Sequence, residues 1–378
     1  MLFPLSKKNR SILPAAGLLW MLSSWLCVVS CKKSGGPDVA VADSIYYGRL
    51  EFVVQDNGTY SNFTSGLQLT GWLDTLGHPG PFTVAMPNND AFNSGYVASY
   101  LPANLANFIQ AIGGVDADVV PYQTDAILKG AISFRSLPVG DNQVCATISG
   151  GSVYVTRYLA GSDTLTTVNG QAAISLDNPA SNGLIQVLTG IPNPQEYPTV
   201  WRKMLSDTNM AYFAFAVQRA HLDTLLQGPG PFTVLAPING AFRNATWLNI
   251  NLGSLDSIAA ADTAVLRNII LYHILPGRYF LNDFRRQLTD TLSVTMLNGE
   301  VMKVTLDQLV PGSFPVTPYA LGFGGSGNLT NPNVPVYGKL ATVGGPYFAT
   351  PNGTYYPNYG DWPEGNGVVH TINQVLIP

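Results

Sequence analysis

Two hydrophobic periods alternate along the chain, and proline or glycine stands where one gives way to the other. Apolar residues recur at helical spacing over 212–222, and residues 232–236 then alternate between apolar and other side chains until Pro237. Residues 82–87 show the same alternation and also end in proline. The pattern predicts a helix that leads into a short buried strand.

Each strand pattern is followed by a helical stripe and then by a hairpin. The stripes cover residues 105–112 and 266–274 and are closed by glycine or proline. The hairpins cover 144–158 and 292–306, and the Asn298-Gly299 pair of the second is typical of a type I′ turn. Because this order lacks the strand–helix–strand rhythm of a parallel sheet, we predict an α+β fold.

The chain also contains an internal repeat. FTVAMPNNDAF at 82–92 returns as FTVLAPINGAF at 232–242, and a Leu-Asp-Thr-Leu string precedes each copy. NGLIQVLTGIP begins at Asn182, and NGVVHTINQVLIP begins at Asn366. The same order of motifs in two places indicates two copies of one domain.

These motifs resemble the fasciclin family. The second copy is the closer match, since it adds LRNIILYHILPG at 266–277, which is similar to the central Tyr-His motif of the family. The resemblance implies two tandem domains, each a β-wedge or sandwich with packed helices, over 44–196 and 197–378. It also implies adhesion or binding rather than catalysis.

The first copy departs from the family pattern. Asp125-Ala126 replaces the Tyr-His pair of the second copy, and Gln186 replaces His370. We interpret the motif residues as structural, with His273 as a buried core histidine and the residues after each motif proline as helix caps. They are Asn88, Asn89, Asp90, Asn239, Tyr272, His273 and His370.

The first 31 residues have the layout of an export signal. Three basic residues precede an apolar run, which ends in Val-Val-Ser-Cys31. This ending resembles the lipobox of bacterial lipoproteins, in which the cysteine carries lipid. The alternative is an uncleaved membrane anchor. We predict a signal peptide over 1–31, a tether over 32–43, and a protein lipid-anchored in the cell envelope, at the outer membrane, with the membrane face left open.

Composition narrows the possible chemistry. Charged residues make up 11% of the 378 residues and the net charge is −4, so we predict no nucleic-acid partner. Beyond Cys31 only Cys145 remains, in a predicted strand, and one cysteine cannot form an internal disulfide. The four histidines show no metal-ligand spacing, and catalytic and cofactor motifs are missing from the sequence. We therefore predict no metal, no cofactor and no enzymatic activity.

The second copy contains a long segment, 311–363, rich in Gly, Pro, Asn and Tyr. Its aromatic content predicts an ordered insertion, which either packs on its own domain or binds a partner. Three functions follow: an adhesin for a protein partner, a glycan-binding accessory lipoprotein of an outer-membrane uptake system, and a hydrolase without a motif behind it. The candidate ligand-binding residues are Tyr319, Tyr347, Tyr355, Tyr356, Tyr359 and Trp362.

Overall fold

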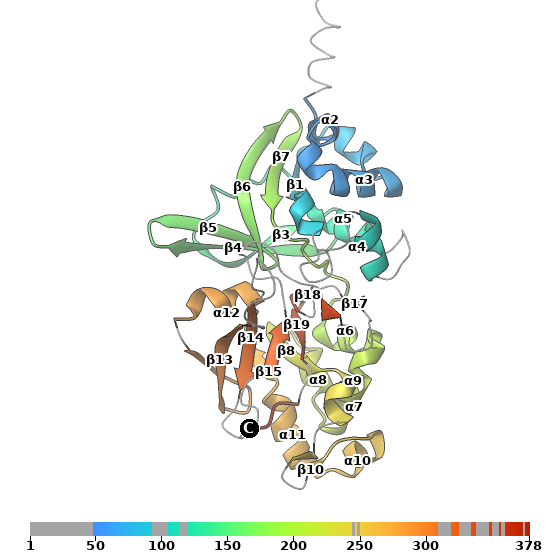
Figure 1. Ribbon diagram of the computed structural model, residues 1–378, viewed down its shortest axis with the longest axis vertical. Coiled ribbons are helices and arrows are strands. Elements are labelled where there is room, and N and C mark those ends of the chain that lie inside the picture. Colours follow the sequence, from blue (N-terminus) through green and yellow to red (C-terminus); the bar gives the residue numbers. More distant parts are fainter. Residues whose placement is uncertain are drawn as a thin grey trace, which may run out of the picture. The chain divides into compact units, whose positions relative to one another are not determined.

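The computed structural model of the protein (Figure 1) contains two successive α+β repeats, which we name the first repeat (to residue 196) and the second repeat (from residue 197). The predicted signal, tether and Cys31 lie outside the residues that the structure describes. Within these residues no helix is long and apolar enough to cross a membrane. The structure describes residues 48–92, 105–112, 119–243, 246–247, 250–289, 291–308, 319–324, 334–337, 348–349, 355–356, 360–372 and 375–378.

The first repeat places helices before a seven-stranded sheet of order β2-β1-β7-β6-β5-β4-β3. Neighbouring strands are antiparallel, except that β1 and β7 run parallel. The elements are α2 (Leu50–Gln55), η1 (Gly58–Tyr60), α3 (Ser61–Thr70), η2 (Asp74–Gly77), β1 (Phe82–Pro87), η3 (Asn89–Phe92), α4 (Leu105–Ile112), α5 (Val120–Ala126), β2 (Ile127–Lys129), β3 (Gly140–Ala146), β4 (Ser152–Ala160), β5 (Asp163–Val168), β6 (Gln171–Ala180) and β7 (Gly183–Leu188).

The second repeat follows the same plan with a divided sheet. Its main sheets have the orders β11-β8-β19-β18 and β12-β13-β14-β15, and β8 runs parallel to β19. The helices are α6 (Val200–Ser206), η5 (Thr208–Met210), α7 (Ala211–Arg219), α8 (Asp223–Leu226), α9 (Asn239–Arg243), α10 (Leu255–Ala260), α11 (Thr263–Leu271) and α12 (Leu281–Gln287). The strands are β8 (Phe232–Pro237), β9 (Thr246–Trp247), β10 (Ile250–Asn251), β11 (Ile274–Pro276), β12 (Thr291–Thr295), β13 (Val301–Gln308), β14 (Tyr319–Gly324), β15 (Val334–Tyr337), β16 (Phe348–Ala349), β17 (Tyr355–Tyr356), β18 (Trp362–Glu364) and β19 (Gly367–Ile372).

The parallel pairs join the first and the last motif of each repeat. Val84 lies opposite Ile185 in the first repeat, and Val234 lies opposite Val369 in the second. A strand with a neighbour on each side and a core on each face has to be apolar on both faces, which explains why all of β8 is buried. In the first repeat, Val84 packs with the helices, whereas Ala85 joins a second core formed by β3, β4 and β5.

The predicted tandem α+β fold is confirmed, but one helix boundary was wrong. The apolar stripe 266–274 does not continue as a helix, because α11 ends at Leu271 and Ile274 begins β11. Tyr272 and His273 therefore lie in the turn between helix and strand. Pairing of Ile274–Pro276 with β8 ends the helix, because these three residues make strand contacts instead of a further helical turn.

The predicted insertion 311–363 is in part a section of the sheet itself. β14 pairs with both β13 and β15, as β5 pairs with both β4 and β6 in the first repeat. At its other end β18 pairs with β19 as the end of β6 pairs with β7. The first repeat thus runs one long strand, β6, where the second repeat has β15 and β18 with additional chain between them.

Candidate functional site

Two asparagines clamp the first helix of each repeat to its closing strand. The Asn182 Oδ1 accepts from Leu50 N at 2.8 Å, and its Nδ2 donates to Leu76 O and His78 O at 2.8 and 2.7 Å. The Asn366 Oδ1 likewise accepts from Val200 N at 2.7 Å. Its Nδ2 donates at 2.9 Å to Leu226 O, at the end of α8, and at 2.6 Å to Gly228 O, two residues further on. Sequence reasoning placed both residues at the start of the closing motif without assigning them a role.

The asparagines of the first motif hold the other helices of each repeat. The Asn89 amide donates to Gly58 O at 2.8 Å and accepts from Asn62 N at 3.0 Å. Asn239 makes the same two bonds at the start of α7, at 2.7 and 2.9 Å. Asn88 is buried and caps η3, since its Oδ1 accepts from Ala91 N at 3.0 Å. Asp90 is exposed in the first turn of η3.

His273 is fully buried and bonded through both ring nitrogens. Leu376 N donates to its Nε2 at 2.9 Å, so the ring proton lies on Nδ1, which donates to Ile269 O at 2.8 Å. Burial lowers the His273 pKa to about 4, and the ring is neutral at neutral pH. Tyr272 beside it is 1% exposed, and its hydroxyl donates to Val301 O at 3.3 Å. The pair therefore joins α11, the hairpin and the C-terminal segment.

His370 is also buried and neutral. Its Nδ1 accepts from Asp361 N at 2.9 Å, its Nε2 donates to Tyr279 O at 2.9 Å, and burial lowers its pKa to about 4. In the first repeat Gln186 makes the equivalent bonds, since it donates to Ile132 O at 3.2 Å and accepts from a backbone N–H at 2.8 Å. The departure from histidine thus preserves the contact.

The aspartates next to these side chains also match, but their surroundings differ. Asp177 and Asp361 have positive φ angles of 60° and 61°. The Asp177 Oδ1 accepts from Phe134 N at 2.8 Å, and the Asp361 Oδ1 accepts from Leu281 N at 2.7 Å. Desolvation raises the pKa of Asp177, but hydrogen bonds from Gln186 and its other partners outweigh it, so the pKa is lowered. Asp361 is 2% exposed, and desolvation raises its pKa to about 8.

Asp125, which replaces tyrosine of the Tyr-His pair, holds the segment between the repeats. Its Oδ2 accepts from Gln195 N at 2.7 Å, and its Oδ1 accepts from Thr147 Oγ1 at 3.2 Å and from Ser149 Oγ. Burial raises the Asp125 pKa against the lowering effect of these hydrogen bonds. The Tyr-His position is therefore used for a different clamp in the first repeat.

An aromatic and cationic contact joins the two repeats. Tyr154 of β4 packs with Phe280 and Val368 of the second repeat, and all three are buried. The Arg278 guanidinium carbon lies 3.6 Å from the centre of the Tyr154 ring. Its nitrogens donate to carbonyl oxygens of the β18–β19 turn, including Glu364 O at 2.8 Å. A guanidinium suits this place because it stacks on the ring and donates in several directions at once.

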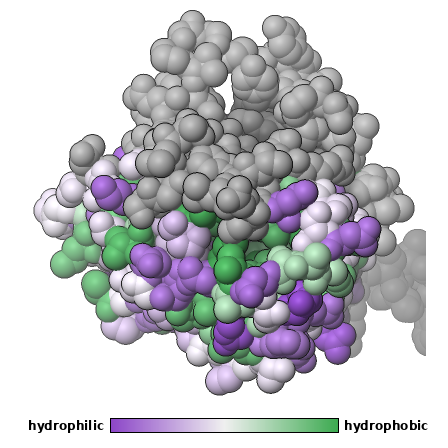
Figure 2. Space-filling view, turned by 90° about the horizontal axis from the view of Figure 1, so that it is seen from below, coloured by the Kyte–Doolittle hydropathy of each residue, from purple (hydrophilic) through white to green (hydrophobic). Residues whose placement is uncertain are grey.

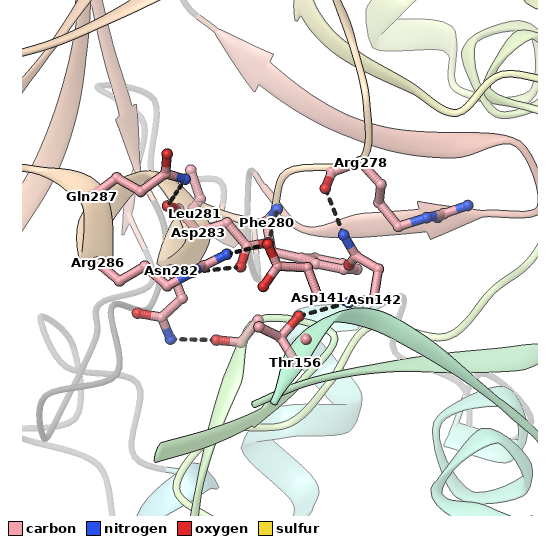
Figure 3. Close-up of polar contacts among 12 residues, drawn as sticks. Asp141, Asn142, Thr156, Arg278, Phe280, Leu281, Asn282, Asp283, Arg286 and Gln287 are labelled. Atoms are coloured by element: carbon pink, nitrogen blue, oxygen red, sulfur yellow. Dashed lines mark hydrogen bonds and ion pairs between the residues drawn. The ribbon is translucent and has the colours of Figure 1, made fainter. Parts of the chain in front are cut away.

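Polar contacts surround this centre (Figure 3). Asn142 of β3 donates to Arg278 O at 2.8 Å, while Asn282 of α12 donates back to Gly170 O at 2.5 Å. Asp141 pairs with the Arg286 guanidinium at 2.7 Å. The close-up shows these side chains from the β3–β4 hairpin and α12 pointing toward one another. We name this group, together with the aromatic contact above, the inter-repeat junction.

A buried glutamate lies at the edge of the junction. The Glu364 side chain is 0% exposed, and its Oε2 accepts from Tyr197 N at 2.7 Å. Its Oε1 has no hydrogen-bond partner among the described residues. Desolvation raises the Glu364 pKa to about 9. Lys203 lies close by, but its ammonium pairs with Glu196 at 2.7 Å and sits 3.7 Å from the ring centre of Trp362.

The candidate ligand-binding aromatics fall into three groups. Trp362 is half-buried, and one face of its ring meets the Lys203 ammonium. Tyr319, Tyr355 and Tyr356 lie in strands β14 and β17. Tyr347 and Tyr359 lie outside the described residues.

One pocket of about 440 Å³ lies between β10, α10 and the start of α11. Buried Leu252 and Leu266 line it beside Ser257 and Asp262. The Asp262 carboxylate already accepts from the backbone N–H groups of residues 264 and 265. Figure 2 views the molecule from below. On the coloured part of this lower face, apolar and hydrophilic side chains are interleaved.

The described residues were compared with what metal binding and thiol reactivity require. They contain no group of three or more His, Cys, Asp or Glu side chains placed to hold a metal ion. Burial raises the pKa of the Cys145 thiol, which disfavours the reactive thiolate. The polar side chains that recur in both repeats, at the first-motif asparagine and at the Asn-Gly of the closing motif, are engaged by backbone groups.

Comparison with known proteins gives a consistent match. A family model described as "Fasciclin domain" matches residues 58–191 and 208–317. Periostin of Homo sapiens is 25% identical over 250 residues, which cover 66% of this chain and 27% of periostin. Transforming growth factor-beta-induced protein ig-h3 of Sus scrofa is 24% identical over 302 residues, which cover 79% of this chain and 35% of that protein. A solved domain pair from the insect cell adhesion molecule fasciclin I aligns with a TM-score of 0.36 and 15% identity, over 85% of this chain and 98% of that one.

Proposed function

Because the chain belongs to the fasciclin-domain family, we propose that it is an adhesion or interaction protein, held in the cell envelope at the outer membrane by lipid on Cys31. The use of the recurring polar side chains as internal clamps carries this proposal. Asn89, Asn182, Asn239 and Asn366 each hold backbone groups that lie 27 or more positions away from the asparagine in the sequence. Because these side chains are used for hydrogen bonds within the domain, they build a scaffold, and we expect such a scaffold to function through its surfaces.

Surface side chains support a binding role. Val144 of β3, Leu165 of β5 and Ile174 of β6 are 67%, 45% and 60% exposed. Leu165 and Ile174 lie on neighbouring strands, beside the paired residues Thr166 and Ala173. Exposed apolar side chains on a rigid sheet are suited to contact another macromolecule.

The anchor is tested separately from binding. We expect the wild-type chain to fractionate with membranes and its N-terminal peptide to carry acyl mass on Cys31. A Cys31→Ser variant should appear in the soluble fraction. If Cys31→Ser remains in the membrane fraction to the same extent as the wild type, this result would contradict a lipid anchor and favour a spanning segment.

Binding is tested with the full chain against envelope proteins and polysaccharides. Because β14, β15 and β18 belong to the two main sheets of the second repeat, the informative deletion removes only 338–359. It joins β15 directly to β18, in the place where the first repeat has the single strand β6. Saturable binding to a protein that survives this deletion supports the adhesion proposal. Sugar binding that the deletion abolishes favours the glycan-binding alternative, while turnover of an ester or glycoside would overturn both.

A further inference from the structure

Two buried carboxyl groups lie where the second repeat meets the first repeat and the connection, which we define as residues 189–199 between β7 and α6. A Cβ on Gly170 of the first repeat would lie 2.9 Å from the Asp361 Oδ2, so backbone of one repeat covers the carboxyl of the other. The Glu364 carboxyl accepts from Tyr197 N of the connection, and the Glu364 carbonyl oxygen lies 3.5 Å from the Tyr154 hydroxyl. Asp361 is 2% and Glu364 0% exposed. Separation of the repeats would therefore admit water to both carboxyl groups.

The charges around Glu364 do not neutralise it. Burial raises the Glu364 pKa more than Lys203 of α6 and Arg278 lower it, because Lys203 is paired with Glu196 of the connection, which adds a negative charge nearby. Arg278 donates to carbonyl oxygens, and Tyr154 is a neutral phenol. Within the described part of the chain, no Lys or Arg nitrogen is within 4.0 Å of the Glu364 carboxylate. A carboxyl group buried without a partner charge is held in its neutral form.

The charges around Asp361 lead to the same result. His370 of β19 lies 3.9 Å away, but its nearer nitrogen accepts from Asp361 N, so the ring is neutral. Asp283 of α12 is a second acidic group close by, which is 2% exposed and whose pKa desolvation raises to about 6. Arg286 pairs with Asp283 at 3.3 Å and with Asp141 of β3 at 2.7 Å. The nearby cation is thus shared by two other carboxylates.

Asp177 of the first repeat is an internal control for the effect of the junction. It has the same backbone conformation and the same bond to a backbone N–H as Asp361, but it is half-buried, and its hydrogen bonds lower its pKa and favour the ionised carboxylate. The difference between the two aspartates follows from their surroundings, since the first repeat packs against the Asp361 site. Packing of the repeats and protonation of this carboxyl are therefore linked.

We propose that the inter-repeat junction is a proton-dependent clasp, which is closed while Asp361 and Glu364 are protonated and loosens when they ionise. The sign follows from the raised pKa values in the closed state, about 8 and about 9. Protonation stabilises the closed state fully below about pH 4, the ordinary pKa of a carboxyl group. This stabilisation is lost as pH rises through 8 and 9. Each group contributes up to about tenfold per pH unit, so the closing constant falls by up to about 100-fold per unit near neutral pH. Opening would expose the apolar contact of Tyr154, Phe280 and Val368.

The proposal is tested by the distance between spin labels on the full chain, one at Asp163→Cys in the first repeat and one at Gln227→Cys in the second, with Cys27→Ser, Cys31→Ser and Cys145→Ala to remove the three native thiols. Both labelled positions are exposed. We expect one narrow distance distribution at pH 6 and a broad one at pH 9 to 10. The Asp361→Asn/Glu364→Gln chain imitates the protonated state and should stay narrow at both pH values. Asp177→Asn is the matched control and should broaden like the wild type.

Two results would overturn the clasp. One is a wild-type distribution that stays narrow to pH 10, and the other is equal broadening of wild type and the double variant. If the double variant does not fold by circular dichroism, Glu364→Gln alone decides, because its amide oxygen still accepts from Tyr197 N. Its closing constant should then change by about tenfold per pH unit instead of about 100-fold, and an unchanged pH dependence contradicts the proposal.

Discussion

Removal of the Asn366 side chain should destabilise the second repeat more than the equivalent change destabilises the first. Asn366 is 6% exposed, and its amide makes three hydrogen bonds of 2.6 to 2.9 Å. A typical hydrogen bond contributes about 1 kcal/mol net, and a buried group left without a partner costs about 1–3 kcal/mol. Because Asn366→Ala leaves Val200 N without its partner in a buried position, we expect a loss of about 3–5 kcal/mol.

Asn182→Ala is the matched comparison. Asn182 makes the same three bonds, but it is half-buried and its bond to His78 O is exposed, so water replaces part of what is lost. We expect about 1–2 kcal/mol from this variant. Urea unfolding followed by tryptophan fluorescence separates the repeats in chains that keep, of the six tryptophans, only Trp72 of the first repeat or only Trp201 of the second. Equal losses from the two variants, or a loss below about 1 kcal/mol for Asn366→Ala, would refute the reasoning.

Three further substitutions test individual contacts. His370→Gln should cost below about 1 kcal/mol at pH 7 because Gln186 makes the same contacts in the first repeat. Burial lowers the pKa of His370 to about 4, so the neutral ring stabilises the folded state above about pH 6.5, and this stabilisation is lost as pH falls to about 4. Near pH 4 the glutamine variant should therefore have the higher free energy of unfolding, by up to about 3 kcal/mol. Gly170→Ala should lower Tm clearly more than Gly161→Ala, because both have positive φ but only at Gly170 would a Cβ meet Phe280, at 2.9 Å; equal shifts would contradict the close contact. Arg278→Lys should cost about 2–4 kcal/mol in urea unfolding, because an ammonium cannot stack on a ring and bridge several carbonyl oxygens together.

The fold was predictable where local pattern determines it. Period-two alternation ended by proline identified β1 and β8, and glycine-rich turns identified the hairpins β3–β4 and β12–β13. The repeated strings then showed that both halves share one plan. The parallel pairing of first and last motif was not visible in this way, because it joins segments 101 residues apart in the first repeat (Phe82 and Gly183) and 135 apart in the second (Phe232 and Gly367), and it leaves no periodic signal.

The site residues were less predictable. The sequence identified His273 as a residue on an apolar stripe, but its bond to Leu376 N depends on a tertiary contact across 103 positions. The equivalence of Gln186 and His370 was equally hidden, since an amide and an imidazole share little in a sequence alignment but offer one donor and one acceptor at similar positions. The apparent loss of a motif was in this case a change of side chain with the hydrogen bonds retained.

The residues at the junction show that the contact is specific to this pair of repeats. The hairpins β3–β4 and β12–β13 have matching backbone bonds, so the position of Tyr154 in the first repeat is that of the exposed Lys303 in the second. Ile132 O and Tyr279 O accept the equivalent hydrogen bonds from Gln186 and His370. The next residue in each repeat is therefore also equivalent, so that Phe280 of the second repeat matches Ser133 of the first. A further copy stacked in the same orientation would bring lysine against serine where this junction has tyrosine against phenylalanine. The aromatic contact is therefore specific to these two repeats, and a further repeat stacked in the same way would not form it.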